Sequence, residues 1–216
     1  MELNILRYNY IMMATHTNKD SHNLMHIIKP NTVGAEIGVW FGNTSTQFLK
    51  RSLKKLYMVD SYSVEPYKEN SERTYQEYLA KYQPITGEFA EAGFQKYYDR
   101  VYTEINSRFR TFKEVEICRM LSDEWFKKYN DVELDWIYID GDHSYEGCLR
   151  DLENALKIVK PGGFILGDDY GWPPLKPGVD KWGKVGVTKA VNEFINNNNL
   201  TKRMFRHGVT QFEIRI

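Results

Sequence analysis

The sequence predicts an α/β fold with a mostly parallel sheet, and three observations support this prediction. From Thr32 onward, short apolar runs alternate with longer amphipathic runs, as expected of parallel strands joined by helical crossovers. The run LDWIYID at 134–140 is almost continuously apolar, which is typical of a strand buried on both faces. The length of 216 residues is close to that of one domain with an elaboration. We therefore expect a single domain over 1–216.

The short apolar runs predict the strands, which in chain order are 32–39, 56–60, 114–118, 134–140 and 164–169. A helix is expected at 44–55, because Phe48 and Leu53 fall on one face and basic residues gather in its C-terminal half, where they oppose the helix dipole. A second helix begins at Ser144, since apolar residues recur after it at helical spacing, and KPGG at 160–163 ends it.

Four further segments complete the expected fold. Residues 61–113 are crowded with tyrosine and interrupted by Pro84 and Gly87, so we expect inserted helices that form a cap after the second strand. Residues 1–31 form an N-terminal extension. Near the C-terminus, VTKAVNEFI predicts a short helix, and MFRHGVTQFEIRI predicts an antiparallel hairpin at the sheet edge.

Charge and cysteine content exclude several classes of function. Lys+Arg and Asp+Glu both number 29, so nothing in the overall charge points to nucleic acid or an anionic membrane as a partner. Cys118 and Cys148 form no C-x-x-C pair, which argues against a disulfide framework or a cysteine zinc site. No apolar run reaches the length of about 18 residues that a membrane span requires, and the N-terminal stretch lacks signal-peptide features. We expect a soluble, cytoplasmic protein.

Glycines and acidic residues meet where the first two strands end. Glu36, Gly38 and Gly42 lie between the first strand and its helix, where glycine allows a tight turn and a close approach to a ligand. An ordinary strand-to-helix turn is the alternative. Asp60 ends the second strand, and an acid at this distance past a glycine turn can accept hydrogen bonds from ribose hydroxyls. A solvated turn or helix-capping residue is the alternative for Asp60.

Acidic residues and one histidine follow the fourth and fifth strands, namely Asp140, Asp142, His143, Asp168 and Asp169. Carboxylates at neighbouring strand ends converge on one edge and provide the oxygen ligands that Mg²⁺ prefers. His143 is a candidate general base because imidazole titrates near neutral pH, and Asp142 is its competitor. The alternative is that Asp142 or Ser144 caps the following helix, and that the aspartates at 168 and 169 only form a turn.

These motifs resemble those of the class I S-adenosylmethionine-dependent methyltransferases, and closely those of their metal-dependent small-molecule O-methyltransferase branch. The resemblance is carried by the glycine motif, by Asp60 and by IDGDHSYEGCLRDLENALKIVKPGGFILGDDY at 139–170. It covers about 32–195 and is weak over 61–113 and 171–183. It implies a Rossmann-like seven-stranded sheet with helices on both faces, and Mg²⁺-dependent methylation of a small hydroxylated acceptor such as a sugar or natural product.

The resemblance also implies roles in binding S-adenosylmethionine. Glu36 corresponds to the position near the methionine amino group, and Asp60 to the position on the ribose hydroxyls. The positions against the cofactor are those of Gly38, Gly42 and Asp140. Ser122, in the loop after the third strand, corresponds to a residue near adenine, although Arg119 stands where relatives often have glycine.

For metal and proton transfer, the family pattern assigns the ligands to Asp140, Asp168 and Asp169. His143 matches the position proposed as the base in sugar O-methyltransferases of this branch. A hydroxyl is nearly neutral at pH 7, so an adjacent cation that lowers its pKa and a positioned base would together assist its attack on an activated methyl group.

An acceptor pocket needs walls, and two segments leave the sheet at the expected edge. We expect 61–113 and GWPPLKPGVDKWGK at 171–184 to form a lid. Alternatively, Tyr75, Tyr78 and Tyr82 are the buried face of a helix or a dimer contact, the latter in a possible homo-oligomer. Weaker candidates for substrate or cofactor packing are Trp40, Tyr62, Tyr145 and Trp172.

Two other functions remain open at this point. An NAD-dependent oxidoreductase would also use Asp60, but Glu36 occupies the place of the first glycine of G-x-G-x-x-G and the acidic residues at the strand ends have no role in that reaction. A module that binds the cofactor without turnover would keep the same fold. Retention of all the candidate metal ligands argues against such a module.

Overall fold

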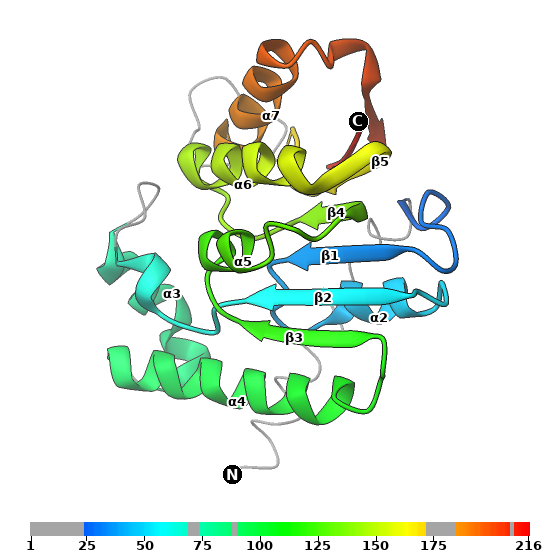
Figure 1. Cartoon of the computed structure of the whole chain (residues 1–216). Helices are drawn as coiled ribbons and strands as arrows, with labels where there is room; N and C mark the ends of the chain where they lie inside the picture. The colour runs from blue at the N-terminus through cyan, green and yellow to red at the C-terminus, as the bar shows by residue number, and fades with distance from the viewer. Residues whose placement is uncertain (1–23, 69–73, 88–89, 172–184, 208–209) are drawn as a thin grey trace.

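The computed structural model describes residues 24–68, 74–87, 90–171, 185–207 and 210–216. Its centre is a seven-stranded sheet of order β3-β2-β1-β4-β5-β7-β6 (Figure 1). All neighbours pair in parallel except β7, which is antiparallel to both β5 and β6. The expected mostly parallel sheet and its antiparallel edge hairpin are confirmed.

The strands have the following bounds: β1 (Val33–Ile37), β2 (Lys55–Asp60), β3 (Val115–Arg119), β4 (Leu134–Ile139), β5 (Val159–Gly167), β6 (Met204–His207) and β7 (Gln211–Arg215). The α-helices are α2 (Asn43–Leu49), α3 (Tyr75–Thr86), α4 (Glu91–Phe109), α5 (Ser122–Lys128), α6 (Tyr145–Ile158) and α7 (Val185–Asn197). Short 3₁₀ helices occupy Glu65–Tyr67 and Thr201–Arg203.

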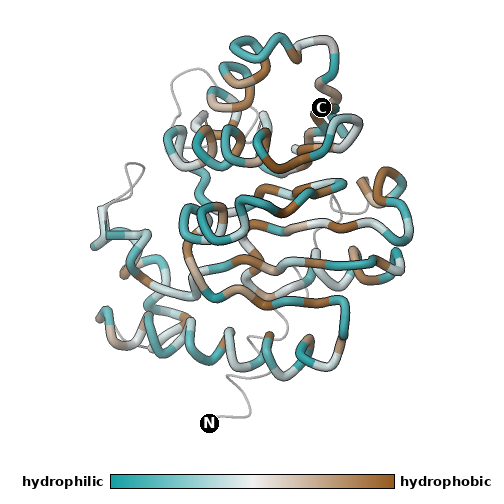
Figure 2. The backbone as a smooth tube through the Cα atoms, in the orientation of Figure 1, coloured by the Kyte–Doolittle hydropathy of each residue, from teal (hydrophilic) through white to brown (hydrophobic). Residues whose placement is uncertain are grey.

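Helices cover both faces of the sheet, as expected. On one face, side chains of α5, α6 and α7, such as Trp125, Leu152 and Phe194, form a buried core with the strands. On the other face, α2, α3 and α4 form a second core that includes Phe48 and Phe109. Hydrophobic residues concentrate in the central strands, while the helices alternate between apolar and polar positions (Figure 2). The sheet is therefore buried on both sides, as a parallel sheet requires.

The observed elements differ from the expected ones in three places. The first helix ends at Leu49, well before residue 55, and Ser52 beyond it adopts a left-handed backbone with φ of 53°. KPGG at 160–163 does not separate α6 from the next strand, because β5 already begins at Val159 and pairs irregularly with β4 there. Helix α5 was not expected, and Ser122 lies at its first position instead of in a loop.

The described part of the insert 61–113 is mainly helical, and many of its aromatic side chains face inward. Tyr78 is buried, and the ring of Tyr82 stacks on that of Phe94 with centroids 4.5 Å apart. Tyr67 contacts both Tyr78 and Phe94. These contacts support the buried-face interpretation of the α3 tyrosines. Helix α3 nevertheless lies beyond the carboxyl ends of β2 and β3 (Figure 1), where a wall of a ligand site is expected.

None of the helices in the described part of the chain is long and apolar enough to cross a membrane.

One buried carboxyl group lies within α6, outside the residues expected at the active site. Asp151 is 1% exposed, and its Oδ1 atom has no hydrogen-bond partner among the described residues. Burial raises the pKa of Asp151 to about 7, and a hydrogen bond from Ser122 opposes this shift. A buried carboxylate without full hydrogen bonding destabilises the folded state once it ionises.

Asp151 predicts a pH-dependent loss of stability. The pKa of Asp151 is higher in the folded than in the unfolded chain. Its contribution to the free energy of unfolding is therefore intact below about pH 4 and is lost as the pH rises to about 7. Asp151→Asn stays neutral, so its melting temperature should exceed that of the wild type at pH 8 and match it at pH 4. The expected gain is roughly 2–4 °C for each kcal/mol recovered, measured by circular dichroism. An equal or lower melting temperature at pH 8 would contradict this account; Glu153→Gln, at an exposed position of the same helix, is the control.

Candidate active site

The carboxyl ends of β1, β2, β4 and β5 lie at the same edge of the sheet (Figure 1). In open α/β sheets, ligands bind outside this edge, between the loops that follow the strands. The glycine motif, Asp60 and the expected acidic cluster all lie at this edge.

The Asp60 carboxylate connects two of these loops. Its Oδ2 atom accepts hydrogen bonds from the backbone N–H groups of Val39 and Trp40, at 3.0 and 2.9 Å, and its Oδ1 atom accepts one from Tyr62 at 2.9 Å. Burial raises the pKa of Asp60, and these backbone hydrogen bonds oppose the shift. A carboxylate has about four lone-pair sites, so one remains for a ligand hydroxyl.

Gly38 and Gly42 shape the turn above β1. Gly38 has φ of 85°, and a Cβ atom added to it would lie 2.1 Å from the carbonyl oxygen of Asp140. Only glycine therefore allows the β1 turn to approach the end of β4 this closely. Gly42, with φ of 65°, precedes α2 and packs against Phe109 of α4.

Glu36 is almost fully buried beneath this turn. It is 1% exposed, and its Oε2 atom accepts a hydrogen bond from the Ser45 hydroxyl. Burial raises the pKa of Glu36 well above its ordinary value, and the carboxyl groups of Asp140 and Asp60 add to the shift. The turn thus has an acidic floor that favours a cationic ligand group.

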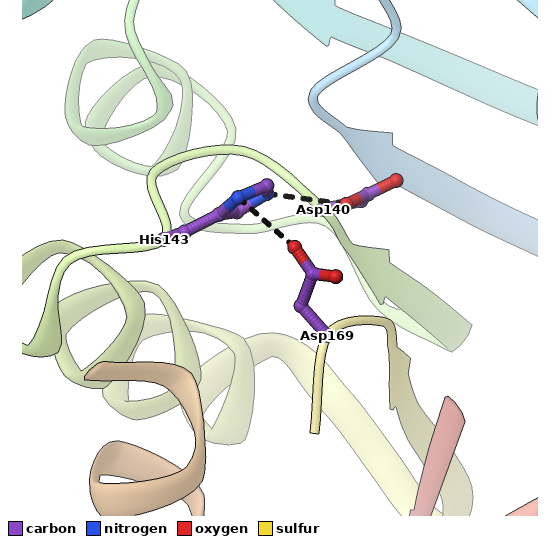
Figure 3. Close-up of side chains that lie close together, drawn as sticks. All are labelled: Asp140, His143 and Asp169. Carbon is purple, nitrogen blue, oxygen red and sulfur yellow. Dashed lines mark hydrogen bonds and ion pairs between the residues drawn. The ribbon is translucent and has the colours of Figure 1, made fainter. Parts of the chain in front are cut away.

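Asp140, His143 and Asp169 come together at the ends of β4 and β5 (Figure 3). The Nε2 atom of His143 lies 3.3 Å from Asp140 Oδ1, and its Nδ1 atom lies 3.1 Å from Asp169 Oδ2. Burial raises the pKa of Asp140 to about 6, and the hydrogen bond with His143 opposes the shift. Among the described residues, this is the group whose ligand atoms lie close enough together, within 4.8 Å, to hold a metal ion.

Asp168 does not join this group. It is 7% exposed, and its Oδ1 atom accepts hydrogen bonds from the Thr210 hydroxyl and, at 2.8 Å, from the backbone N–H of Asp169. Its Oδ2 atom accepts a hydrogen bond from the Tyr138 hydroxyl at 3.2 Å, which in turn accepts one from Gln211. Burial raises the pKa of Asp168. The structure places this carboxylate in a buried network beside the cluster.

Asp142 turns toward α6. Its Oδ1 atom accepts a hydrogen bond from the backbone N–H of Ser144 at 2.9 Å, and its Oδ2 atom packs against Gly147. Ser144 is the N-cap of α6, and its hydroxyl oxygen accepts a hydrogen bond from the Gly147 N–H. Ser144 therefore caps the helix, and Asp142 holds this N-cap residue in place.

Ser122, the expected adenine contact, lies after β3 and is not part of the acidic cluster. Ser122 begins α5 and hydrogen-bonds to Asp151. Arg119, at the end of β3, pairs with Asp99 of α4 and donates to the carbonyl oxygen of Tyr62 at 3.2 Å. Arg119 thus fixes the loop after β2 to α4.

Sequence reasoning missed the strained backbone at this edge. Trp40, Tyr62 and Asp169 have φ of 45°, 45° and 63°, and they follow the ends of β1, β2 and β5. Positive φ is costly for bulky side chains and concentrates at functional sites. Nothing in the local sequence signals these conformations, because none of the three residues is a glycine. Of the weaker candidates, Trp40 is 39% exposed whereas Tyr62 is fully buried; Trp172 lies outside the described residues.

The sequence also matches known proteins. A family model described as a methyltransferase domain matches residues 35–170. An uncharacterized protein of Acanthamoeba polyphaga mimivirus is 40% identical over 52 residues, which cover 22% of this chain and 24% of that protein. The chain therefore matches about a quarter of the length of this curated relative.

Solved structures share the fold at low sequence identity. The O-methyltransferase NovP has a TM-score of 0.52 and 17% identity, with coverage of 91% of this chain and 76% of that chain. An O-methyltransferase from Bacillus cereus, solved in complex with SAH, has a TM-score of 0.53 and 15% identity, with coverage of 99% and 89%. The resemblance to class I methyltransferases and the seven-stranded fold are confirmed.

The Asp60 network predicts a local change in backbone dynamics. Asp60→Ala removes the acceptor of three backbone N–H groups, and each hydrogen bond to a charged group contributes about 1.5–3 kcal/mol. Hydrogen exchange at Val39, Trp40 and Tyr62 should therefore accelerate about tenfold or more. Asp135→Ala is a matched control, because Asp135 accepts from the Val33 N–H at 2.7 Å at the opposite end of β1. Unchanged protection of Trp40 in Asp60→Ala would disprove the role of this carboxylate.

Proposed function

The chain belongs to the methyltransferase domain family, and from this premise we propose that it transfers a methyl group from S-adenosylmethionine to a hydroxyl of a small acceptor, with Mg²⁺ beside the reacting oxygen. The observation that carries this proposal is the convergence of Asp140, His143 and Asp169 next to the glycine turn. Family membership favours this reaction over that of an NAD-dependent oxidoreductase.

The residues around the glycine turn suit S-adenosylmethionine. We assign the ribose to Asp60, whose one remaining lone-pair site, after its three backbone hydrogen bonds, would accept a hydrogen bond from one ribose hydroxyl. Glu36, beneath the turn, provides the acidic environment for the methionine amino group. We assign Gly38 and Gly42 to the turn against the cofactor, and Ser122 to its adenine end. The bound cofactor would supply an activated methyl group.

His143 is the proposed general base. Its Nδ1 atom lies 3.1 Å from Asp169 Oδ2, and a carboxylate in this position fixes the orientation of the ring. The Nε2 atom points toward Asp140 at 3.3 Å, so a small shift of the ring would let it accept a proton from an acceptor hydroxyl. Asp142 remains the alternative base, although its carboxylate is occupied at the α6 N-terminus.

The donor set of the cluster fits a divalent cation. No described residue forms a hydrogen bond with Asp140 Oδ2 or Asp169 Oδ1, since each carboxylate uses only its other oxygen toward His143. Mg²⁺ is usually bound by one or two carboxylates together with waters and substrate oxygens, so these two carboxylate oxygens suit a Mg²⁺ site. The family pattern adds Asp168 as third ligand, whereas the hydrogen bonds of Asp168 support a role in fixing the loop of Asp169. A cation here would add positive charge next to the acceptor oxygen.

The helical insert is a natural wall for the acceptor, since α3 lies beyond the carboxyl ends of the strands (Figure 1). Trp40 is 39% exposed and is fixed by a hydrogen bond from its indole N–H to the Tyr97 hydroxyl at 3.2 Å. The second expected part of the lid, 172–184, lies outside the described residues. We propose that Trp40 and the insert line the acceptor pocket.

Methyl transfer tests the assignment of the base. With labelled S-adenosylmethionine and a panel of polyhydroxylated acceptors, His143→Ala should reduce the rate by roughly 10²–10⁴-fold, the usual contribution of a general base. Asp142→Asn should retain most of the rate, after correction for stability, because the Asp142 carboxylate accepts a hydrogen bond from the N-cap residue Ser144. Full activity of His143→Ala together with loss of activity in Asp142→Asn would reverse the assignment.

Metal binding tests the ligand set separately. Methylation should be abolished by a chelator and restored by Mg²⁺. In titration calorimetry with Mn²⁺ alone, Asp140→Asn and Asp169→Asn should each lose binding. If Asp168 is a ligand, Asp168→Asn should lose it as well; if Asp168 only fixes the loop, binding should weaken without being lost. Activity that survives complete removal of metal would refute the metal-dependent part of the proposal.

A further inference from the structure

The N-terminal half of α7 contacts both loops that carry the Asp140–His143–Asp169 cluster. One loop joins β4 to α6 and contains His143, and the other follows β5 and contains Asp169. Asp140 and Asp169 adjoin strand ends that the sheet fixes, whereas His143 lies within its loop. The position of the imidazole therefore depends on what packs behind that loop.

Gly186, in the first turn of α7, packs directly against the His143 loop. A Cβ atom added to Gly186 would lie 2.5 Å from the carbonyl oxygen of His143, 2.7 Å from the backbone nitrogen of Tyr145 and 3.0 Å from the carbonyl carbon of Ser144. All three are backbone atoms, which cannot move aside as the end of a flexible side chain can. Any larger residue at 186 must displace either α7 or the His143 loop.

Helix α7 also holds the loop after β5. The Thr188 hydroxyl oxygen accepts a hydrogen bond from the backbone N–H of Gly171 at 2.8 Å, and Asn192 accepts one from the Tyr170 hydroxyl at 2.9 Å. Lys189 lies over the Tyr145 ring, 3.8 Å from its centroid, which adds a second contact to the other loop. Helix α7 therefore links the two loops at several points within two turns.

We propose that Gly186 and Thr188 are positioning residues, and that α7 sets the separation between His143 and the two carboxylates. Gly186 fixes how closely the His143 loop approaches α7, and Thr188 fixes the loop of Asp169 to the same helix. The inference concerns the geometry of the cluster; its consequence for catalysis rests on the proposed function. Residues that orient catalytic or metal-binding groups in this way usually contribute 10–100-fold to metal affinity or activity.

The experiment compares four variants of the full chain. Gly186→Ala adds the clashing Cβ, and Thr188→Val removes the hydroxyl while keeping the side-chain shape. Thr188→Ser retains the hydroxyl and should rescue the interaction. Gly163→Ala is the matched control, because its Cβ would lie 2.7 Å from the carbonyl oxygen of Asp135, a similarly crowded position but in the middle of β5 instead of at its carboxyl end.

Two readouts separate positioning from general loss of stability. The first is the NMR spectrum of the His143 imidazole nitrogens in metal-free protein, assigned with His143→Gln. The second is the dissociation constant for Mn²⁺. Gly186→Ala and Thr188→Val should shift the His143 resonances and raise the dissociation constant about tenfold or more. Thr188→Ser and Gly163→Ala should leave both unchanged, even though Gly163→Ala lowers the melting temperature.

Unchanged His143 resonances in both Gly186→Ala and Thr188→Val would overturn the inference. Equal shifts in Gly163→Ala would overturn it as well, because they would reflect general destabilisation. If Gly186→Ala does not fold, the comparison of Thr188→Val with Thr188→Ser decides. The proposed function can fail independently: a wild type that neither binds Mn²⁺ nor methylates any acceptor refutes it, while the His143 resonances still test the role of α7.

Discussion

The parallel pairing of β1, β2, β4 and β5 is the constraint on which the rest of the structure depends. Parallel strands end at one edge, so residues far apart in the chain meet there because of their place in the register. Gly38 shows how tight this meeting is, since its turn touches the backbone of Asp140. The Asp60 carboxylate then fixes the turn by accepting hydrogen bonds from Val39 and Trp40. Sheet register and a few loop hydrogen bonds thus build the site.

Sequence reasoning could predict much of this arrangement, and its errors have a physical cause. Strand ends are visible as apolar runs that stop at acidic residues, so the convergence of Asp140, His143 and Asp169 follows from the predicted sheet. The placement of Asp168 could not be predicted from the same pattern. Adjacent residues leave a strand toward opposite sides, and Asp169 follows with a left-handed backbone, φ of 63°, that the sequence does not signal. One carboxylate therefore faces the cluster and the other enters a buried network.

Local sequence also could not reveal which polar residues are structural. Aspartate and serine are common both in helix caps and in catalytic loops. Only their contacts show that Ser144 caps α6 and that Asp142 holds Ser144 in place. The role of the α3 tyrosines is equally ambiguous in the sequence, since aromatic residues at helical spacing fit a pocket wall and a buried helix face equally well. Contact with Phe94 decides for the buried face. In each case the deciding partner lies on another turn or another helix.

The charge at the carboxyl edge constrains what can bind there. Glu36, Asp60, Asp140 and Asp168 all have pKa values raised by burial, so each carboxyl group holds its proton more tightly than in water. Bringing them together costs free energy unless positive charge or hydrogen-bond donors compensate. Backbone N–H groups compensate Asp60, and hydroxyls compensate Glu36 and Asp168. Among the described residues, only the His143 side chain offers the Asp140 carboxylate a compensating hydrogen bond. Asp140, at the proposed metal site, thus has a single described partner, and a cationic ligand would stabilise its carboxylate further.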